Sequence, residues 1–462
     1  MSGDTLPHGA ATRRMAEWAA TVSRERTLST RTHAQKGIKD LLGCMIGGSA
    51  ETVPKRVAQV ALLLFGGSGG PCTLVGSGQR VSAAAAAFAN GASAHILDFD
   101  DSFRPLTGHP SCTIVPAILA VAEEQHASGD DVIDAYVVGV EISAAMGRAA
   151  PKHHDVGWHG TATVGVVAAA VACARVLRLD TDGVANAISV AVSASSGSRM
   201  QIGYDVKCVQ PGAAARDAVL AAYLAKAGIR GNPEVLVGPW GWSKLYAGVD
   251  SDGSEYVFPG PGEPLAIVDP GITYKPYPTC GSTHRTLNAV LEMCHRHNIR
   301  ADDVERIETV IPFLNTQNLR YDRPVNGMQA RFSMPYTCAV AVLCRQIRLS
   351  DFEDAAIARP DVQALMERVS MRTLPGSEHT DKTYLEMPCY TKISLRSGRV
   401  YEDERYDRRG ESTQPLTTEE ERFKFEDCTR SVLTESQRKQ ILALLENLGS
   451  VTDVAALTEL LR

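Results

Sequence analysis

The sequence predicts a mainly α protein with a large helical region and a smaller α+β region. Apolar residues recur at helical spacing through most of residues 1–266, whereas alternation typical of strands is found only within residues 267–406. A Pro/Gly cluster, FPGPGEP at 258–264, separates the two patterns. The chain has 462 residues, which is more than one ordinary core needs. We therefore expect two domains.

Composition narrows the classes of function. A net charge of −6 and the lack of a long basic run give no positive field for nucleic acid, so we expect no nucleic-acid partner. The longest apolar window, residues 164–174, is much shorter than the ~20 residues that span a membrane. The N-terminal residues contain no signal-peptide core. We expect a cytoplasmic protein without a membrane partner.

The first third of the chain reads as consecutive helices joined by glycine-rich loops. Residues 12–25, 32–48 and 52–67 are each amphipathic at helical spacing. The connector at 65–77 contains GGSGGP, which lacks the GK[ST] ending of a phosphate-binding loop. We expect this connector to be a plain loop.

The next segment is the first candidate for an active site. Residues 82–101 predict an Ala-rich helix with Ser82 as its N-cap. On that helix His95, Asp98 and Ser102 are spaced i, i+3 and i+7, which would place them on one face. The apolar neighbours of these residues indicate a buried segment, and buried carboxylates need partners.

Three further candidates lie just before predicted helices. His109 precedes a helix that we expect Ser111 to cap, and His159 precedes a long helix of small residues. Lys207 lies just before a helix delimited by Pro211 in its first turn and Gly228 after its last. Helices are also predicted over residues 130–150 and 180–197.

The α+β region shows a different order of elements. A strand is predicted at 304–314 and a hairpin with a Ser-Gly turn at 389–407. Helices are predicted at 280–298 and 332–347, and the tail from 417 onward returns to amphipathic helix.

The candidates share a position that favours anions. His109, His159, Lys207 and His284 each lie near the start of a predicted helix, where unpaired N–H groups and the helix dipole attract negative charge. If these helices converge, the pocket would suit a di- or tricarboxylate. The same dipole disfavours imidazolium, so the histidines could accept protons near pH 7, and Asp98 could orient a ring or move a proton. This chemistry suits proton abstraction beside a carboxylate, followed by elimination, decarboxylation or reprotonation.

Other chemistries find little support. The eleven cysteines are scattered singly without a CxxC pair, which indicates reduced core thiols. The HHD at 153–155 and the CHRH at 294–297 lack a third ligand group at suitable spacing, so we expect no metal site.

Five segments in order resemble signatures of the MmgE/PrpD family. They are LDFDDSF with GHPS (97–111), GWHGTATVG (157–165), the Lys207 segment ending in PGAAARDAVLAAYLA, KPYPTCGSTH (275–284) and RFSMPY (331–336). That family includes 2-methylcitrate dehydratases, cis-aconitate decarboxylases and iminodisuccinate epimerases.

The resemblance implies a cofactor-free and usually homodimeric enzyme. Its large all-helical domain would comprise residues 1–266 and 407–462, and an α+β lid domain would comprise residues 267–406. By motif position, the implied catalytic residues are Asp98, Ser102, His109, His159, Lys207 and His284, and the substrate contacts are Lys207, Cys280, Tyr336 and Arg104. Either Cys280 or His284 would reach the substrate.

Three departures from the family pattern bear on the reaction. Gln210 stands where a histidine is frequent, Ser102 stands where the decarboxylases have threonine, and the loop from Ser102 to His109 is one residue longer than theirs. These features speak against cis-aconitate decarboxylation and give a spacing closer to the epimerases. We expect a general acid–base lyase, a dehydratase or decarboxylase of a 2-methylcitrate-like acid. The alternatives are an epimerase of an iminodisuccinate-like dicarboxylate and a non-catalytic binding or scaffold protein.

Overall fold

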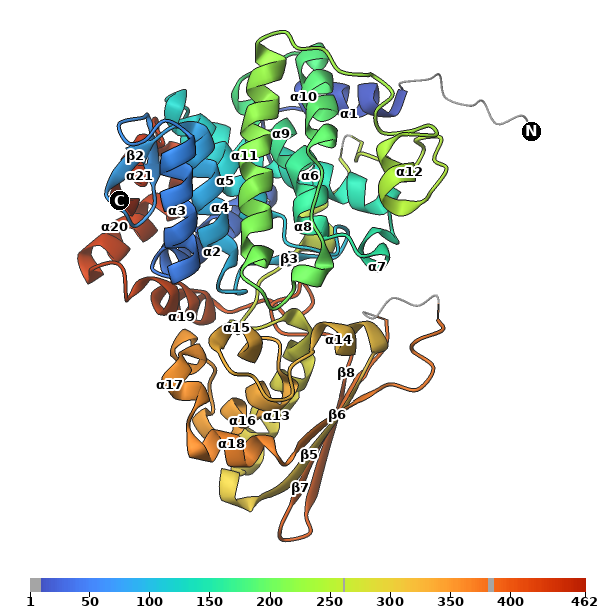
Figure 1. Cartoon of the computed structure of the whole chain (residues 1–462), viewed down its shortest axis with the longest axis vertical. Helices are drawn as coiled ribbons and strands as arrows, with labels where there is room; N and C mark the ends of the chain where they lie inside the picture. The colour runs from blue at the N-terminus through green and yellow to red at the C-terminus, as the bar shows by residue number, and fades with distance from the viewer. Residues whose placement is uncertain (1–9, 261, 381–385) are drawn as a thin grey trace.

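The structure is a computed structural model that describes residues 10–260, 262–380 and 386–462. A large helical body occupies the upper part of Figure 1 and a smaller α+β body the lower part, which confirms the predicted fold class. Residues 1–9 of the predicted helical domain and Pro261 of the predicted Pro/Gly boundary lie outside the described residues. Among the described helices, none has the length and apolar content needed to cross a membrane.

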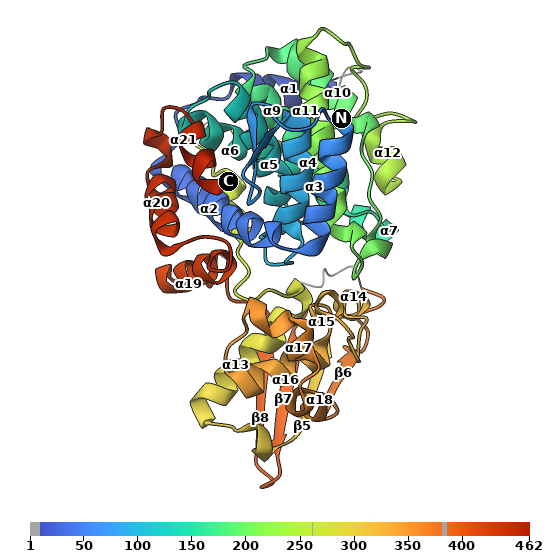
Figure 2. The ribbon, with the colours of Figure 1, turned by 60° about the vertical axis from the view of Figure 1, so that its left-hand side comes forward.

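The large body contains most of the helices, and the C-terminal tail returns to it, as Figure 2 shows. Its helices are α1 (Ala10–Thr21), α2 (Leu28–Ser49), α3 (Thr52–Leu64), α4 (Ala83–His95), α5 (Ser111–Glu124), α6 (Gly129–Ala149), α7 (His153–Val156), α8 (Gly160–Thr163), α9 (Gly165–Val176), α10 (Thr181–Ser193), α11 (Val206–Lys226), α12 (Trp242–Ala247), α19 (Thr418–Thr429), α20 (Glu435–Glu446) and α21 (Ala455–Thr458). One hydrophobic core joins buried side chains from Ala11 to Tyr274 with others from Leu416 to Leu461.

Helices α4 and α11 approach each other closely because glycine lies at their contact. A Cβ atom at Gly91 would lie 2.8 Å from Cα of Gly212, and a Cβ atom at Gly212 would lie 2.4 Å from the carbonyl oxygen of Phe88. Backbone packed against backbone leaves no space for a methyl group. This contact holds the C-terminal end of α4 beside the first turn of α11.

The smaller body is a four-stranded sheet with helices on one face. Its strands are β5 (Val304–Ile311), β6 (Val369–Thr373), β7 (Cys389–Leu395) and β8 (Val400–Arg405), in the spatial order β6-β5-β7-β8. Only the β5–β6 pair is parallel. Its helices are α13 (His284–His297), α14 (Phe313–Asn318), α15 (Gly327–Ala330), α16 (Met334–Cys344), α17 (Asp354–Ile357) and α18 (Pro360–Met366). A separate core lies between the sheet and helices α13, α16 and α18.

The two chain segments that join the bodies lie side by side. Strand β3 (Ser102–Phe103) of the large body pairs with β4 (Ile272–Thr273), just before the chain enters the smaller body. On the return path, the N–H of Tyr274 donates to the carbonyl oxygen of Gly410 at 3.0 Å. The limits of the two domains, at residues 266/267 and 406/407, stay a prediction.

The helix predicted over residues 82–101 ends earlier than the pattern indicates. Ser82 caps α4 as predicted, accepting from the N–H of Ala85, but the helix ends at His95. Asp98 has a φ of 50°, in the left-handed region, which a right-handed helix cannot contain. The prediction that His95, Asp98 and Ser102 share a helix face is therefore wrong, and Ser102 lies on strand β3 instead.

Three other local predictions also need correction. Helix α11 begins at Val206, so Lys207 is inside its first turn and Pro211 lies within the helix. The N-cap position of α5 is Pro110 rather than Ser111, whose hydroxyl group donates to Asp101. The connector at 65–77 is not a plain loop, because β1 (Cys72–Leu74) forms a hairpin with β2 (Gln79–Val81).

The α4–α11 contact gives a test of the fold. We expect Gly212→Ala to lower the free energy of unfolding by about 1–3 kcal/mol, because its methyl group would collide with the backbone of α4. Urea denaturation followed by circular dichroism measures this change. The control is Lys226→Ala, on the exposed end of the same helix. Equal stability of the two variants would show that the contact tolerates a side chain.

Candidate active site

The centre of the candidate site is the carboxylate of Asp98. Nζ of Lys207 lies 2.7 Å from Oδ1 of Asp98, and Nζ of Lys275 lies 3.3 Å from the same oxygen. Lys275 also donates to the carbonyl oxygen of Asp98 at 2.7 Å. All three side chains are buried. Burial alone would raise the pKa of Asp98, but the two ammonium groups hold that pKa well below its usual range. Asp98 is therefore ionised at neutral pH.

Three distant segments bring this cluster together. Asp98 lies in the turn after α4, Lys207 lies in the first turn of α11, and Lys275 follows strand β4 by two residues. The contact between α4 and α11 places Lys207, and the β3–β4 pairing places Lys275. Asp98 has a left-handed backbone conformation in this turn, and its carboxylate faces both ammonium groups.

His95 lies next to this cluster, and its hydrogen-bond partners determine which of its ring nitrogens carries the proton. Nζ of Lys207 lies 2.9 Å from its Nε2, and its Nδ1 lies 2.8 Å from Oδ2 of Asp100. An ammonium group only donates hydrogen bonds, so Nε2 accepts and Nδ1 carries the proton. Burial lowers the pKa of His95. The ring is therefore neutral, and both of its nitrogens are engaged.

Two further imidazoles surround His95. The ring centroids of His109 and His159 lie 4.8 Å and 5.8 Å from that of His95. Nδ1 of His109 donates to the carbonyl oxygen of Asp101, and Nδ1 of His159 lies 2.7 Å from Oε1 of Gln210. Burial lowers the pKa of His109 to about 3 and that of His159 well below its usual value. Both rings are therefore neutral near pH 7, and burial, rather than the helix dipole invoked from the sequence, is the main cause.

A cavity of about 110 Å³ lies beside this arrangement. Lys275 and His109 are part of its lining, whereas Asp98, Lys207 and His159 are not among the described residues that line it. Its lining also includes Ser102, Cys280 and Arg408. Arg408 donates to the hydroxyl of Ser102 at 3.1 Å and pairs with Glu411 at 3.0 Å. The cavity is small and its lining carries three cationic side chains, Arg104, Lys275 and Arg408, which suits a small anionic molecule.

The remaining predicted residues differ in how near they lie to this cavity. Cys280 and the exposed Arg104 are part of its lining. His284 is buried at the start of α13, where its Nε2 lies 3.1 Å from the carbonyl oxygen of Thr279. Tyr336 is buried in the smaller core, and its hydroxyl donates to the carbonyl oxygen of Asp351. Neither His284 nor Tyr336 is among the described residues that line the cavity.

Sequence reasoning assigned no role to Lys275, Arg408 or Asp100. For Lys275 a signal exists, because a lysine in the apolar segment ITYKPYP has to be paired if it is buried. Arg408 lies in a charged segment, EDERYDRRG, in which nothing distinguishes it from its neighbours.

One group of side chains has the donor atoms of a metal site. Nitrogen atoms of His95 and His109 and an oxygen atom of Asp100 lie within 4.8 Å of one another. However, both nitrogens of His95 already have hydrogen-bond partners, and the ammonium group of Lys207 touches one of them. This chemistry fits a hydrogen-bonded network better than a cation site.

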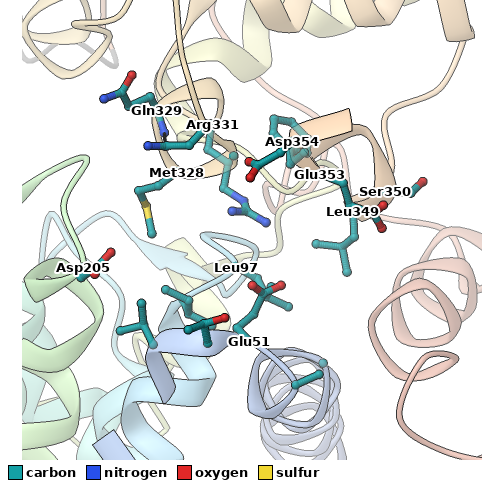
Figure 3. Close-up of a pocket in the computed structure, with 18 of the residues that line it drawn as sticks. Glu51, Leu97, Asp205, Met328, Gln329, Arg331, Leu349, Ser350, Glu353 and Asp354 are labelled. Carbon is teal, nitrogen blue, oxygen red and sulfur yellow. Dashed lines mark hydrogen bonds between the residues drawn. The ribbon is translucent and has the colours of Figure 1, made fainter. Parts of the chain in front are cut away.

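A larger cleft of about 860 Å³ is lined by residues of both bodies. Its lining includes Leu97 and Asp205, which are close in sequence to Asp98 and Lys207. Figure 3 shows that Arg331 extends into this cleft toward Leu97 and Glu51. The Arg331 guanidinium lies 5.3 Å from the ring centroid of Phe352, and its Nε has no hydrogen-bond partner among the described residues.

Two family models match the chain. The MmgE/PrpD N-terminal domain matches residues 13–253, and the MmgE/PrpD C-terminal domain matches residues 277–449. These matches confirm the resemblance found in the sequence motifs.

Similar proteins are cis-aconitate decarboxylases. The human protein is 28% identical over 389 residues, covering 82% of this chain and 79% of the human protein. The mouse protein is 26% identical over 443 residues, covering 93% of this chain and 88% of the mouse protein. The Aspergillus terreus protein is 28% identical over 426 residues, covering 85% of this chain and 84% of the Aspergillus protein. The predicted enzyme class, a lyase, is confirmed at this level.

The depressed pKa of His109 predicts how stability depends on pH. An unfolded histidine takes a proton near pH 6.5, whereas folded His109 does so only near pH 3, so the free energy of unfolding falls as the pH drops between these values. We expect His109→Asn to reduce this slope by up to about 1.4 kcal/mol per pH unit. Urea unfolding at pH 7, 6 and 5 measures the slope.

Two features make the difference in slope between wild type and His109→Asn specific to His109. Burial raises the pKa of Asp101 to about 8, which gives the opposite slope, but this contribution is common to wild type and variant. The exposed histidine variant His126→Gln is the control. Parallel curves for His109→Asn and wild type would contradict a neutral, partly buried His109.

Proposed function

Because the chain belongs to the MmgE/PrpD family, we propose that it is a cofactor-independent general acid–base lyase of a small di- or tricarboxylate. Release of carbon dioxide is the first reaction to test. The observation that carries this proposal is the buried Asp98–Lys207–Lys275 cluster beside a small cationic cavity. The curated relatives named above support decarboxylation rather than another elimination.

In the proposed reaction the cationic side chains that line the cavity bind the substrate carboxylates, and the neutral side chains lie beside them. Lys275 and Arg408 line it and would bind substrate carboxylates, with the Ser102 hydroxyl beside them. When the bond to the departing carboxyl group breaks, its electron pair stays on the substrate as a carbanion conjugated with a second carboxylate. Positive charge that is already in place stabilises this developing negative charge.

The carbanion then needs a proton. Burial and the charge of Asp98 raise the pKa of the Cys280 thiol, so Cys280 holds its proton at neutral pH. This makes Cys280 a possible donor rather than a nucleophile, with the ammonium group of Lys275 as the other candidate on the lining. Dehydration would use the same groups differently, with neutral His109 removing the proton beside a carboxylate and a cationic group assisting the loss of hydroxide.

A second candidate is epimerisation of a small dicarboxylate. Its support is the pair of neutral imidazoles on separate segments, His109 before α5 and His159 before α8. Two such groups could remove a proton from one face of a carbon and return it to the other. The longer Ser102–His109 loop, which the hydrogen bond between Phe103 N–H and Gly108 C=O closes, also fits this candidate.

One incubation separates these outcomes. The purified protein is mixed with citrate-like, aconitate-like and aspartate-like acids in heavy water, and products are followed by NMR. Carbon dioxide release supports decarboxylation, a new alkene with loss of water supports dehydration, and deuterium uptake without net change supports the epimerase. Saturable binding without any reaction supports the non-catalytic alternative and contradicts the proposal.

The role of Lys275 is tested on the best acid from that panel. We expect Lys275→Met to lower kcat/KM by about 10²–10³-fold, because it removes one of the charges on the reacting carboxylate system. The control Lys226→Met changes an exposed lysine on α11. Full activity of folded Lys275→Met would remove this residue from the mechanism.

We also propose that the chain forms a homodimer through α3. Val60, Leu63 and Leu64 of this helix are 46%, 82% and 65% exposed, and Leu220 of α11 is 53% exposed. Helix α11 lies beside the end of α3, where Arg216 lies over the ring of Phe65. Large apolar side chains exposed next to one another on a helix commonly mark an interface.

Light scattering after gel filtration tests this interface. We expect the double variant Leu63→Lys/Leu64→Lys to be monomeric at a concentration at which the wild type is dimeric, because buried ammonium groups would oppose association. Leu245→Lys, which changes another exposed leucine, on α12, is the control. A dimeric double variant would exclude this face.

A further inference from the structure

We propose that Gln210 is a positioning residue that fixes His159 in the neutral tautomer with the proton on Nδ1, so that Nε2 is available as a base. This inference rests on the proposed function for its kinetic consequence, but the tautomer itself is a property of the free protein.

The side-chain amide of Gln210 has only one workable orientation. Its Nε2 donates to the carbonyl oxygen of Ser198 at 3.1 Å, and its Oε1 lies 2.7 Å from Nδ1 of His159. If the amide were turned over, its oxygen would face another carbonyl oxygen. An amide oxygen only accepts hydrogen bonds, so Nδ1 of His159 must donate. In a neutral ring Nε2 then carries the lone pair, and it has no hydrogen-bond partner among the described residues.

The backbone holds the same histidine in place. The N–H of His159 donates to the carbonyl oxygen of Gly197 at 3.0 Å, next to the Ser198 carbonyl that anchors Gln210. Gly197 has a φ of 138°, and a Cβ atom there would lie 3.1 Å from Cβ of Ala162 and 3.4 Å from Oε1 of Gln210. Glycine at this position therefore lets the loop, the glutamine and the imidazole pack together.

The charge of the side chain that accepts the hydrogen bond from His159 affects the protonation of the imidazole as much as its position does. The groups whose charge acts on His159 are His95 at the end of α4, Lys207 on α11 and His109 before α5, and each of them disfavours imidazolium. Gln210 follows Lys207 by three residues on the same helix. A neutral amide orients the ring without stabilising its protonated form, whereas a carboxylate at this position would stabilise it.

Two variants separate orientation from charge. Gln210→Met removes the acceptor while keeping a similar volume, and Gln210→Glu keeps an acceptor and adds charge. Nitrogen-15 NMR of histidine-labelled protein reports the tautomer, with the His159 signals assigned by their loss in His159→Asn. We expect the wild type to be protonated on Nδ1 alone at pH 7, Gln210→Met to show both tautomers, and Gln210→Glu to be protonated on both nitrogens.

Kinetics on the best acid provide the second readout. We expect Gln210→Glu to move the acid limb of the kcat/KM profile to higher pH by at least about one unit, and Gln210→Met to lower kcat about 10-fold or more without moving that limb. The corresponding variants of exposed Gln440 on α20 are the controls.

The results distinguish the two proposals. A wild type protonated on Nε2, or an unchanged tautomer in folded Gln210→Met, would overturn the role of Gln210. If no acid reacts but the NMR result is as expected, the proposed function fails and the positioning role stands. Equal losses of activity at every pH in both variants, with no change in tautomer, would indicate a purely structural role.

Discussion

The pairing of one buried carboxylate with two buried ammonium groups is the constraint on which the rest of the site depends. Removing a single partner from such a cluster leaves a charge uncompensated in a low-dielectric interior, which commonly costs about 3–5 kcal/mol. The pairing requires the end of α4, the first turn of α11 and the segment after β4 to meet. The glycine contact between the two helices and the β3–β4 pairing make that meeting possible.

The same cluster determines the state of the neighbouring imidazoles. With Lys207 against His95, protonation of that ring would place two positive charges in contact. Burial acts in the same direction on His109 and His159. Positive charge is thus confined to lysine and arginine, which suit carboxylate binding, while His109 and His159 stay neutral and can accept protons. A site for a polyanion needs this separation, because imidazolium formed in the free enzyme could not act as a base.

The sequence predicted the fold class and most helices, because helical periodicity and helix starts are local signals. It placed His109, His159 and Lys207 near helix starts, but whether these helices converge depends on tertiary contacts that no local signal encodes. It did not predict the left-handed turn at Asp98, and so the predicted helix extends too far. The ion pairs of Asp98 in this turn are with residues far away in the chain. Lys275 was missed because its partner is 177 residues away in the chain. The predicted contact of Tyr336 came from its motif position alone, whereas His284 was also a candidate because it lies near a helix start. In the structure His284 lies close to the carbonyl oxygen of Thr279, and the hydroxyl of Tyr336 donates to that of Asp351.

The contact between Tyr274 and Gly410 has a mechanical consequence. Both chain segments that enter or leave the smaller body pass through this one point, and a Cβ atom at Gly410 would lie 1.8 Å from the carbonyl oxygen of Tyr274. Lys275 and Arg408 are one and two residues from it. Two of the cations that line the cavity therefore lie where the chain passes between the two bodies. Their distances from Asp98 and Ser102 depend on how this crossing point is packed as well as on the side chains themselves.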